Sequence, residues 1–264
     1  MSAVHVVKEI YIYPIKSLAG ISLQSAAAEE MGFENDRRWM LIDGSNQLIT
    51  QREYPIMSQF YPQIIDGKIS LVFEDQQHEF FIDECVEPKI ETTVWDDKSE
   101  VFEVNKNTSN WFSDRLGFEC KLVKINNLGD RKHESSKLKE TFNVSLADGY
   151  PYLLIGTESM QVLNDKLEHK ITVKRFRPNI VISTQNAHEE DDFGGFKIGE
   201  VQFKNIKTCE RCIMVNNDPQ KGIVKKEPLK TLSKYRKIGN AVYFGTNIVS
   251  LNSGIINVGD AVIF

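Results

Sequence analysis

Short stretches that alternate between apolar and polar residues, each ended by a turn-forming sequence, fill the first hundred residues of the chain. Asp43-Gly44-Ser45-Asn46 separates residues 38–42 from residues 48–51, a pattern that predicts a hairpin. Asp66-Gly67 and Asp96-Asp97-Lys98-Ser99 separate further strand-like runs. Because long helices do not alternate with these strands, the pattern favours a barrel over a doubly wound parallel sheet.

Helical spacing of apolar residues is confined to three short segments. They are residues 109–116, ended by Gly117, residues 157–167, with Met160, Leu163 and Leu167 on one face, and a segment that opens at Glu227-Pro228. Strand patterns return at residues 180–183, 201–203 and 262–264. The sequence therefore predicts a mainly β (α+β) protein with a few inserted helices.

A charged stretch marks a candidate boundary between two domains. At roughly 150 residues per domain, the 264 residues fill one large domain or two small ones. Residues 126–141 contain seven charged side chains and only two large apolar ones, as expected of a solvated linker. We therefore predict a smaller β-barrel-like domain over residues 1–120 and a second β-barrel domain over residues 121–264.

Charge and hydropathy argue against two classes of partner. The 32 basic and 37 acidic residues give a net charge of −5, and the positive residues are interpreted as scattered, so nucleic acid is not an expected partner. The longest apolar runs are far shorter than the ~20 residues of a membrane-spanning helix, so no membrane association is expected. Residues 1–10 lack the apolar core of a secretory signal. These features predict a cytoplasmic protein.

The motif Cys209-Glu210-Arg211-Cys212 is the most informative local feature, because two thiols this close can converge on one metal or on each other. A closed zinc site needs four ligands, and Cys85, Cys120 and His188 stand alone in the sequence. A thioredoxin-like pair would precede a helix, whereas residues 213–215 have the pattern of a continuing strand. A single thiolate ligand to a redox metal and a buried structural thiol both remain open.

Cationic side chains beside turns form a second group of candidates: Lys16-Ser17, Asp36-Arg37-Arg38-Trp39, Arg52 and residues 175–179. Surface ion pairs are their simplest explanation. Groups at strand ends can also converge on an anion, so these residues suit a phosphorylated organic ligand. Nucleotide-binding glycine loops and a GxSxG elbow do not occur in the sequence. The acidic run at residues 189–192 is predicted to be a solvated loop.

Taken in order, these segments resemble one known family, the MOSC family, named for the C-terminal domain of molybdenum cofactor sulfurase. The segments are Tyr13-Pro14-Ile15-Lys16-Ser17, Asp36-Arg37-Arg38-Trp39, Ile49-Thr50-Gln51-Arg52, Arg175-Phe176-Arg177-Pro178-Asn179, and Cys209-Glu210-Arg211-Cys212 followed by Asp218-Pro219. The chain is most similar to the branch that contains the mitochondrial amidoxime reducing component and its bacterial relatives. The resemblance covers nearly the whole chain and implies a MOSC β-barrel domain preceded by an N-terminal β-barrel domain.

The resemblance implies a molybdenum cofactor, in which a pterin dithiolene and one protein thiolate hold the metal. The family's motif places that ligand at its second cysteine, here Cys212, and an acidic residue near the metal at Asp148. The residues implied to hold the pterin and its phosphate are Lys16, Ser17, Arg37, Arg177 and Asn179, with Arg52 as a further candidate. Pyridoxal phosphate binding is another property associated with the family. A soft thiolate suits a redox metal, and guanidinium groups keep their charge near neutral pH.

The activity implied by the resemblance is the two-electron reduction of N-hydroxylated compounds such as amidoximes, hydroxylamines and N-hydroxylated bases. Because the chain has no C-x₄-C-x₂-C run of an iron–sulfur domain, a separate electron-donor protein carrying flavin, haem or an iron–sulfur cluster is expected. The alternative is a non-catalytic module that carries or hands over the molybdenum cofactor or sulfur. A cofactor-free β protein with structural thiols is the third possibility.

Overall fold

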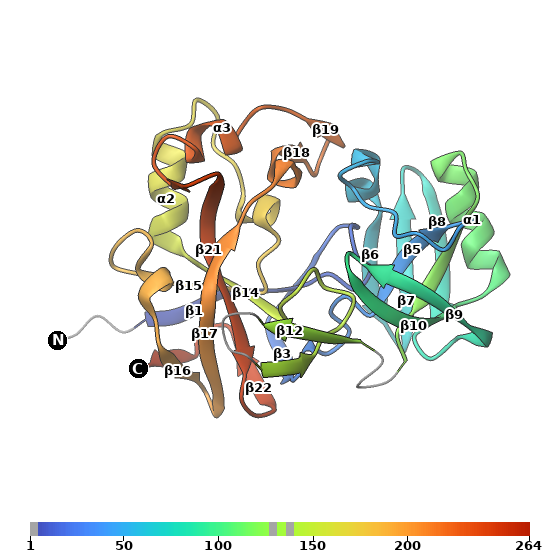
Figure 1. Ribbon diagram of the computed structural model, residues 1–264, viewed down its shortest axis with the longest axis horizontal. Helices are drawn as coiled ribbons and strands as arrows, with labels where there is room; N and C mark the ends of the chain where they lie inside the picture. The colour runs from blue at the N-terminus through green and yellow to red at the C-terminus, as the bar shows by residue number, and fades with distance from the viewer. Residues whose placement is uncertain (1–4, 127–130, 136–139) are drawn as a thin grey trace.

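The computed structural model describes residues 5–126, 131–135 and 140–264. These residues form two bodies side by side: a larger one with strands from both ends of the chain, and a smaller one built from residues 39–124 (Figure 1). Strands predominate, and the described part of the chain contains three α-helices, α1 to α3, and four short 3₁₀ helices, η1 to η4. The prediction of a mainly β protein with a few inserted helices is confirmed. The division of the chain at residue 120 stays a prediction.

A closed barrel of seven strands forms the larger body. Each strand pairs with the next in the order β14, β15, β1, β23, β16, β17, β21, and the pairing of β14 with β21 closes the ring. The strands are β14 (Tyr152–Gly156), β15 (Ile180–Ile182), β1 (His5–Ile12), β23 (Ala261–Ile263), β16 (Gly195–Ile198), β17 (Val201–Glu210) and β21 (Ala241–Ser250). Closure leaves these strands without a long free edge.

Strand β1 contributes to two apolar clusters. Ile10 and Ile12 pack into one cluster, and Tyr11 and Tyr13 pack into another, which also holds Leu163 of helix α2 (Thr157–Asp165). This division follows from the alternation of side chains along a strand. The strand is therefore fixed from both sides at the point where the chain continues to Lys16 and Ser17.

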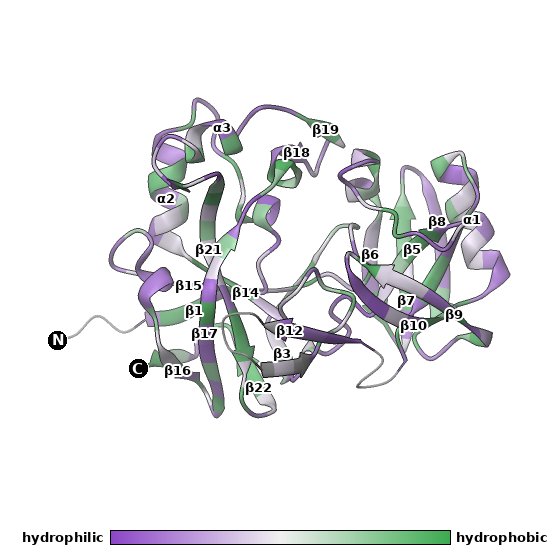
Figure 2. Ribbon diagram, viewed as in Figure 1, coloured by the Kyte–Doolittle hydropathy of each residue, from purple (hydrophilic) through white to green (hydrophobic). Residues whose placement is uncertain are grey.

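Two antiparallel sheets enclose the core of the smaller body. One holds β5 (Trp39–Asp43), β11 (Cys120–Lys124), β10 (Asp97–Glu103) and β9 (Val86–Val94), and the other holds β6 (Tyr61–Ile65), β7 (Lys68–Phe73) and β8 (Gln76–Phe81). Figure 2 shows β5 as largely hydrophobic and β9, at the end of its sheet, as largely hydrophilic. Helix α1 (Lys106–Leu116) adds Trp111 and Phe112 to this core. It starts three residues earlier than predicted, because the Asn105 side chain accepts the Thr108 N–H at 2.7 Å.

The remaining elements are short. They are β2 (Ile21–Leu23), β3 (Ser25–Glu29), β4 (Gly32–Phe33), β12 (Lys132–Ser135), β13 (Glu140–Asn143), β18 (Asn217–Asp218), β19 (Ile223–Val224), β20 (Lys237–Ile238), β22 (Gly254–Asn257), α3 (Leu229–Leu232), η1 (Pro55–Gln59), η2 (Val173–Phe176), η3 (Glu189–Asp192) and η4 (Ile213–Asn216). Within the segment interpreted as a solvated linker, β12 pairs with β13, and Arg131 is only 1% exposed. The described part of this segment is therefore not a solvated loop throughout.

Two strand predictions are wrong for local reasons. Residues 48–51 form no strand, because only Ile42 and Leu48 make an isolated bridge and the Thr50 carbonyl then accepts two N–H groups in a turn. Residues 213–215 lie in η4 and not in a strand, because β17 ends at Glu210 and the Val215 N–H bonds back to the Cys212 carbonyl at 3.3 Å. The first turn carries Arg52, and the second begins immediately after Cys212.

The acidic run at residues 189–192 also differs from the predicted solvated loop. Glu190 is fully buried, and its carboxylate accepts the Gly156 N–H at 3.0 Å and the Ser159 hydroxyl at 2.8 Å. Burial raises the pKa of Glu190, and these two donors oppose the rise. The side chain fastens η3 to the start of α2, so it has a structural role that the acidic composition of the run does not indicate.

Candidate cofactor site

One cleft of about 360 Å³ gathers all eight predicted site residues. They are Lys16, Ser17, Arg37, Arg52, Asp148, Arg177, Asn179 and Cys212. Lys16 and Ser17 follow β1, and Arg37 precedes β5. The other segments precede β14 (Asp148), precede β15 (Arg177 and Asn179) and follow β17 (Cys212), while Arg52 comes from the turn that leads into η1. The structure thus brings the candidates together, and their roles toward a ligand stay predictions.

The Cys212 sulfur and the Asp148 carboxylate share one guanidinium group. Cys212 is exposed, and Arg52 donates from Nε to its Sγ at 3.4 Å. Arg52 Nη2 donates to Asp148 Oδ2 at 3.3 Å, and the guanidinium lies 4.3 Å from the centre of the Trp95 ring. Desolvation lowers the pKa of Arg52, but Asp148 and the thiol outweigh it, so the pKa is raised. A permanent positive charge therefore faces the Cys212 sulfur.

Asp148 receives three donors. Besides Arg52, they are Lys16 Nζ at 2.5 Å and Trp95 Nε1 at 3.1 Å. Desolvation would raise the pKa of Asp148, but Lys16 and Arg52 outweigh it and hold that pKa well below its usual range. Lys16 is buried, which lowers its own pKa to about 8 even though Asp148 opposes the change.

This lowered lysine pKa predicts a pH dependence of stability. Between pH 8 and pH 10.5 the unfolded chain holds a proton on Lys16 that the folded chain has released, so this group makes the free energy of unfolding rise with pH. The slope has an upper limit of ~1.4 kcal/mol per pH unit. We expect Lys16→Met to remove the rise, measured by urea unfolding of both chains at several pH values in this window. Equal slopes in the two chains would contradict the assignment.

A second group of side chains surrounds Tyr13 at the other part of the cleft. The guanidinium groups of Arg37 and Arg177 lie 4.4 Å and 4.1 Å from the centre of the Tyr13 ring. Burial, together with the charge of Arg37, lowers the pKa of Arg177 to about 10. The charge of each guanidinium group disfavours the other, so an anion that contacts both would be stabilised.

Asp36 and Asn179 hold Arg37 in place. Asp36 is fully buried and accepts the Tyr13 N–H at 2.7 Å, Arg37 Nη1 at 2.5 Å and Asn179 Nδ2 at 3.0 Å. Asn179 Oδ1 accepts Arg37 Nη1 at 2.9 Å and the Leu153 N–H at 3.2 Å. Because protein groups occupy both ends of the Asn179 amide, we infer that this residue orients Arg37.

Three residues near the cleft are not among the predicted site residues. Arg131, placed in a solvated linker, is buried and donates to the Ser145 carbonyl at 2.7 Å and the Asp148 carbonyl at 3.2 Å. Arg211 lines the cleft, and its buried Nη2 has no partner among the described residues. Trp95 stands at a two-residue turn between β9 and β10, with φ of +57°. The partners of these three side chains are distant in sequence, so local patterns do not reveal their contacts. For Trp95, the one available signal is a large aromatic residue at a turn.

The contacts of Trp95 predict a modest contribution to stability. Trp95→Ala removes the ring beside Arg52 and the hydrogen bond to Asp148, and we expect the free energy of unfolding to fall by about 1 kcal/mol. Trp95→Phe keeps an aromatic face and should recover part of this loss. Denaturant unfolding of the three chains measures the effect, and no recovery in Trp95→Phe would contradict the ring contact as a cause.

The side chains of the cleft suit a bound anionic molecule, with one thiol available to bind a metal. Six cationic side chains line it, Lys16, Arg37, Arg52, Arg177, Lys207 and Arg211, against the two carboxylates Asp148 and Glu210. Within the described residues no group of three or more His, Cys, Asp or Glu side chains is placed to hold a metal ion. All four cysteines are free; burial raises the pKa of Cys209, whereas Cys212 is exposed. A phosphorylated group bound through its charge, with Cys212 as the one thiolate, fits these residues.

Comparisons with known proteins show which family the chain belongs to. Residues 4–119 match the MOSC N-terminal beta barrel domain, and residues 141–263 match the MOSC domain. The mitochondrial amidoxime reducing component 2 of Bos taurus is 30% identical over 89% of this chain and 74% of that protein. The chain belongs to the MOSC family. Its N-terminal β-barrel domain is thereby confirmed.

Other relatives of this MOSC protein carry two kinds of name. The mitochondrial amidoxime-reducing component 1 of Mus musculus is 29% identical over 99% of this chain and 83% of that protein. The molybdenum cofactor sulfurase of Arabidopsis thaliana is 30% identical over 92% of this chain, which spans about a third of that protein's length. In the described part of the MOSC protein, helices are too short or too polar to cross a membrane.

Proposed function

We propose that this MOSC protein binds a molybdenum cofactor and reduces N-hydroxylated compounds. The observation that carries the proposal is the position of an exposed thiol, Cys212, at a cleft lined by six cationic side chains. Relatives named amidoxime-reducing components support the substrate class. For a hydroxylamine the reaction is R–NHOH + 2 e⁻ + 2 H⁺ → R–NH₂ + H₂O, in which the N–O bond breaks. A separate electron-donor protein would supply the two electrons.

Each predicted residue has a definite task in this proposal. When bound, the cofactor would supply the two-electron redox chemistry that breaks the N–O bond. Cys212 would be the protein ligand, since a soft sulfur suits such a metal. The paired guanidinium groups of Arg37 and Arg177, with Ser17, would hold the phosphate and the pterin. Asn179 would serve indirectly, by orienting Arg37.

Charge states separate the tasks of Asp148 and Lys16. Because its pKa is held well below the usual range, Asp148 is ionised at neutral pH and does not release a proton there. We therefore assign it to fixing Arg52 against the Cys212 sulfur. Lys16, with a pKa of about 8, holds a proton at Nζ at neutral pH that it can give up more readily than an ordinary lysine.

The second candidate is a carrier of the cofactor or of sulfur without catalysis. The sulfurase of Arabidopsis thaliana, which matches 92% of this chain, is the observation that favours it. Such a carrier would use the same cleft, since both candidates need the cofactor bound. Cytoplasmic location and pyridoxal phosphate binding stay predictions.

Metal analysis and a reoxidation assay test both candidates. The protein is purified from a host that makes the cofactor, and its molybdenum and zinc are measured. We expect stoichiometric molybdenum, and reoxidation of the reduced protein by hydroxylamine with release of ammonia. Molybdenum without reoxidation would favour the carrier. Zinc in place of molybdenum, or neither metal, would contradict the proposal.

A further inference from the structure

The positive charge of the chain is concentrated in one segment. Seven of the 32 basic residues stand between Lys221 and Lys237, against a single acidic residue, Glu227. This basic segment, residues 221–237, carries a net charge of +6, so the rest of the chain carries −11 of the total of −5. The cluster corrects the interpretation that the positive residues are scattered.

The basic segment presents its charge to solvent. Its six lysines are all exposed, and none of them forms an ion pair with another described residue: Lys221, Lys225, Lys226, Lys230, Lys234 and Lys237. Arg236, its one arginine, pairs with Asp191. Two apolar side chains of β19 lie among the lysines, Ile223 at 53% and Val224 at 38% exposure. An apolar centre with a charged rim is typical of a surface that binds another protein.

Hydrogen bonds attach the basic segment to the turn that starts at Cys212. Asn216, at the end of η4, accepts the Lys225 N–H on its carbonyl at 3.1 Å and the Leu229 N–H on its side chain at 2.9 Å. Ile213, next to Cys212, is 50% exposed. The segment is therefore fixed to the turn that begins at the exposed Cys212.

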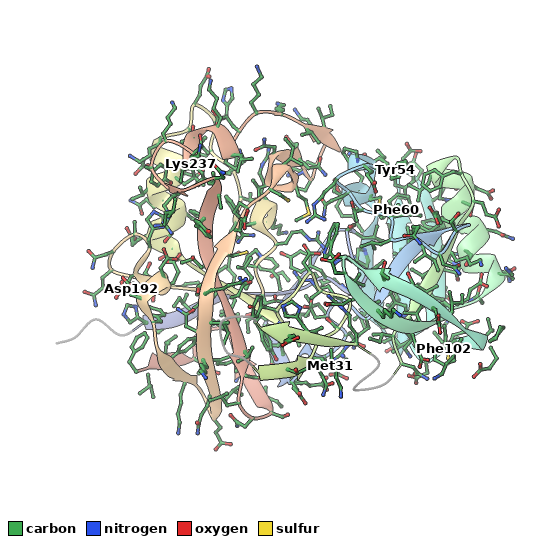
Figure 3. All side chains as sticks on the ribbon, in the orientation of Figure 1. Met31, Tyr54, Phe60, Phe102, Asp192 and Lys237 are labelled. Carbon is green, nitrogen blue, oxygen red and sulfur yellow. The ribbon has the colours of Figure 1, made fainter. Side chains whose placement is uncertain are left out.

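The basic segment also reaches the smaller body. Gly222, with φ of +61°, lies so close to Ile56 that a Cβ added there would be 3.1 Å from the Ile56 Cα. The Gln220 carbonyl accepts the Gln59 side chain at 2.8 Å. Figure 1 shows α3, β18 and β19 along one edge of the molecule, and Figure 3 shows Lys237 and Tyr54 on the same edge. A partner on this edge can contact both bodies.

We propose that the basic segment, with Ile213 and Tyr54, is the docking surface for a small acidic electron-donor protein. The inference rests on the proposed function, which needs such a donor. Exposed charges act over a Debye length of about 8–10 Å, so unpaired lysines at this edge attract an acidic partner and orient it toward the Cys212 end of the cleft. The positive charge is confined to this segment while the rest of the chain is acidic, so a compact acidic partner that covers the segment alone fits it.

Charge reversal with a matched control tests the docking surface. The variant Lys225→Glu/Lys226→Glu is compared with Lys8→Glu/Lys197→Glu, which changes the net charge equally at exposed lysines of β1 and β16. The donor probe is an acidic [2Fe–2S] ferredoxin, reduced by its reductase, with hydroxylamine as substrate. Reduced methyl viologen, a small cationic donor, measures turnover without docking. Ferredoxin affinity is measured separately on the same cofactor-loaded proteins.

We expect the surface variant to lose about 10-fold or more in both ferredoxin affinity and ferredoxin-driven rate, with viologen-driven turnover unchanged. The wild-type ferredoxin rate should fall as salt rises from about 0.02 M to about 0.2 M. Equal losses in both double variants, or no ferredoxin binding by the wild type, would overturn the proposal. Binding of both double variants to anionic phospholipid vesicles is measured as well. If the surface variant loses vesicle binding but keeps its ferredoxin affinity, the surface is assigned to a membrane and the proposal is overturned. Absent turnover with both donors would instead contradict the proposed function, and ferredoxin affinity would still decide the docking surface.

Discussion

Replacement of Cys212 by alanine is expected to release the molybdenum and to lower the reduction of N-hydroxylated substrates by at least ~100-fold. Loss of a residue that only supports a metal ligand typically costs 10- to 100-fold, and loss of the ligand itself should cost more. The fold should survive, because Cys212 is exposed and its side chain contributes little buried area. Molybdenum content and steady-state rate with a chemical electron donor measure the two effects.

The neighbouring cysteine provides the matched control. Cys209 lines the same cleft, but burial raises the pKa of its thiol. It is therefore less suited than the exposed Cys212 to act as a thiolate ligand. Cys209→Ala should therefore keep its molybdenum and most of its activity. If Cys212→Ala keeps full metal and full activity, the proposed ligand is wrong. If Cys209→Ala loses both and Cys212→Ala does not, the ligand has been assigned to the wrong thiol.

Asp36→Ala is expected to lower the free energy of unfolding by about 3–5 kcal/mol, the range for removing one partner of a buried ion pair. The change leaves the largely buried Arg37 guanidinium, whose side chain is 12% exposed, without the carboxylate that pairs with it. It also leaves the Tyr13 N–H and the Asn179 amide without the acceptor they share. Denaturant unfolding at neutral pH measures the loss.

Two further variants separate charge from shape in this network. Asp36→Asn keeps the size of the side chain and one acceptor oxygen, so it should cost less than Asp36→Ala. Asp114→Ala removes an exposed carboxylate from helix α1 and should change the free energy of unfolding by no more than about 0.5 kcal/mol. A loss in Asp36→Ala as small as that of Asp114→Ala would show that the buried network does not stabilise the fold.

Several properties could be predicted from the sequence because they depend on neighbours along the chain. The turn at Asp66-Gly67 joins β6 to β7, and Gly117, with φ of +80°, ends α1. Local alternation and local turn preferences decide such features. A short apolar run is compatible with a strand and with a helical turn. At residues 213–215 the strand prediction therefore failed, because this run forms η4. Burial is similarly not encoded in composition, so Glu190 was expected in solvent.

The sequence by itself determined the mainly β class, the family and the eight candidate residues, because motif residues keep their order and type however the chain is folded. Only the tertiary structure decided that these residues line one cleft, since contacts between the two bodies bring Arg52 and Cys212 within 3.4 Å across 160 positions. It also decided which of them can still contact a ligand. The Asn179 amide is hydrogen-bonded to Asp36 and Arg37, whereas Cys212 is exposed. Hydrogen bonding and burial depend on neighbours in space, and those neighbours exist only after folding.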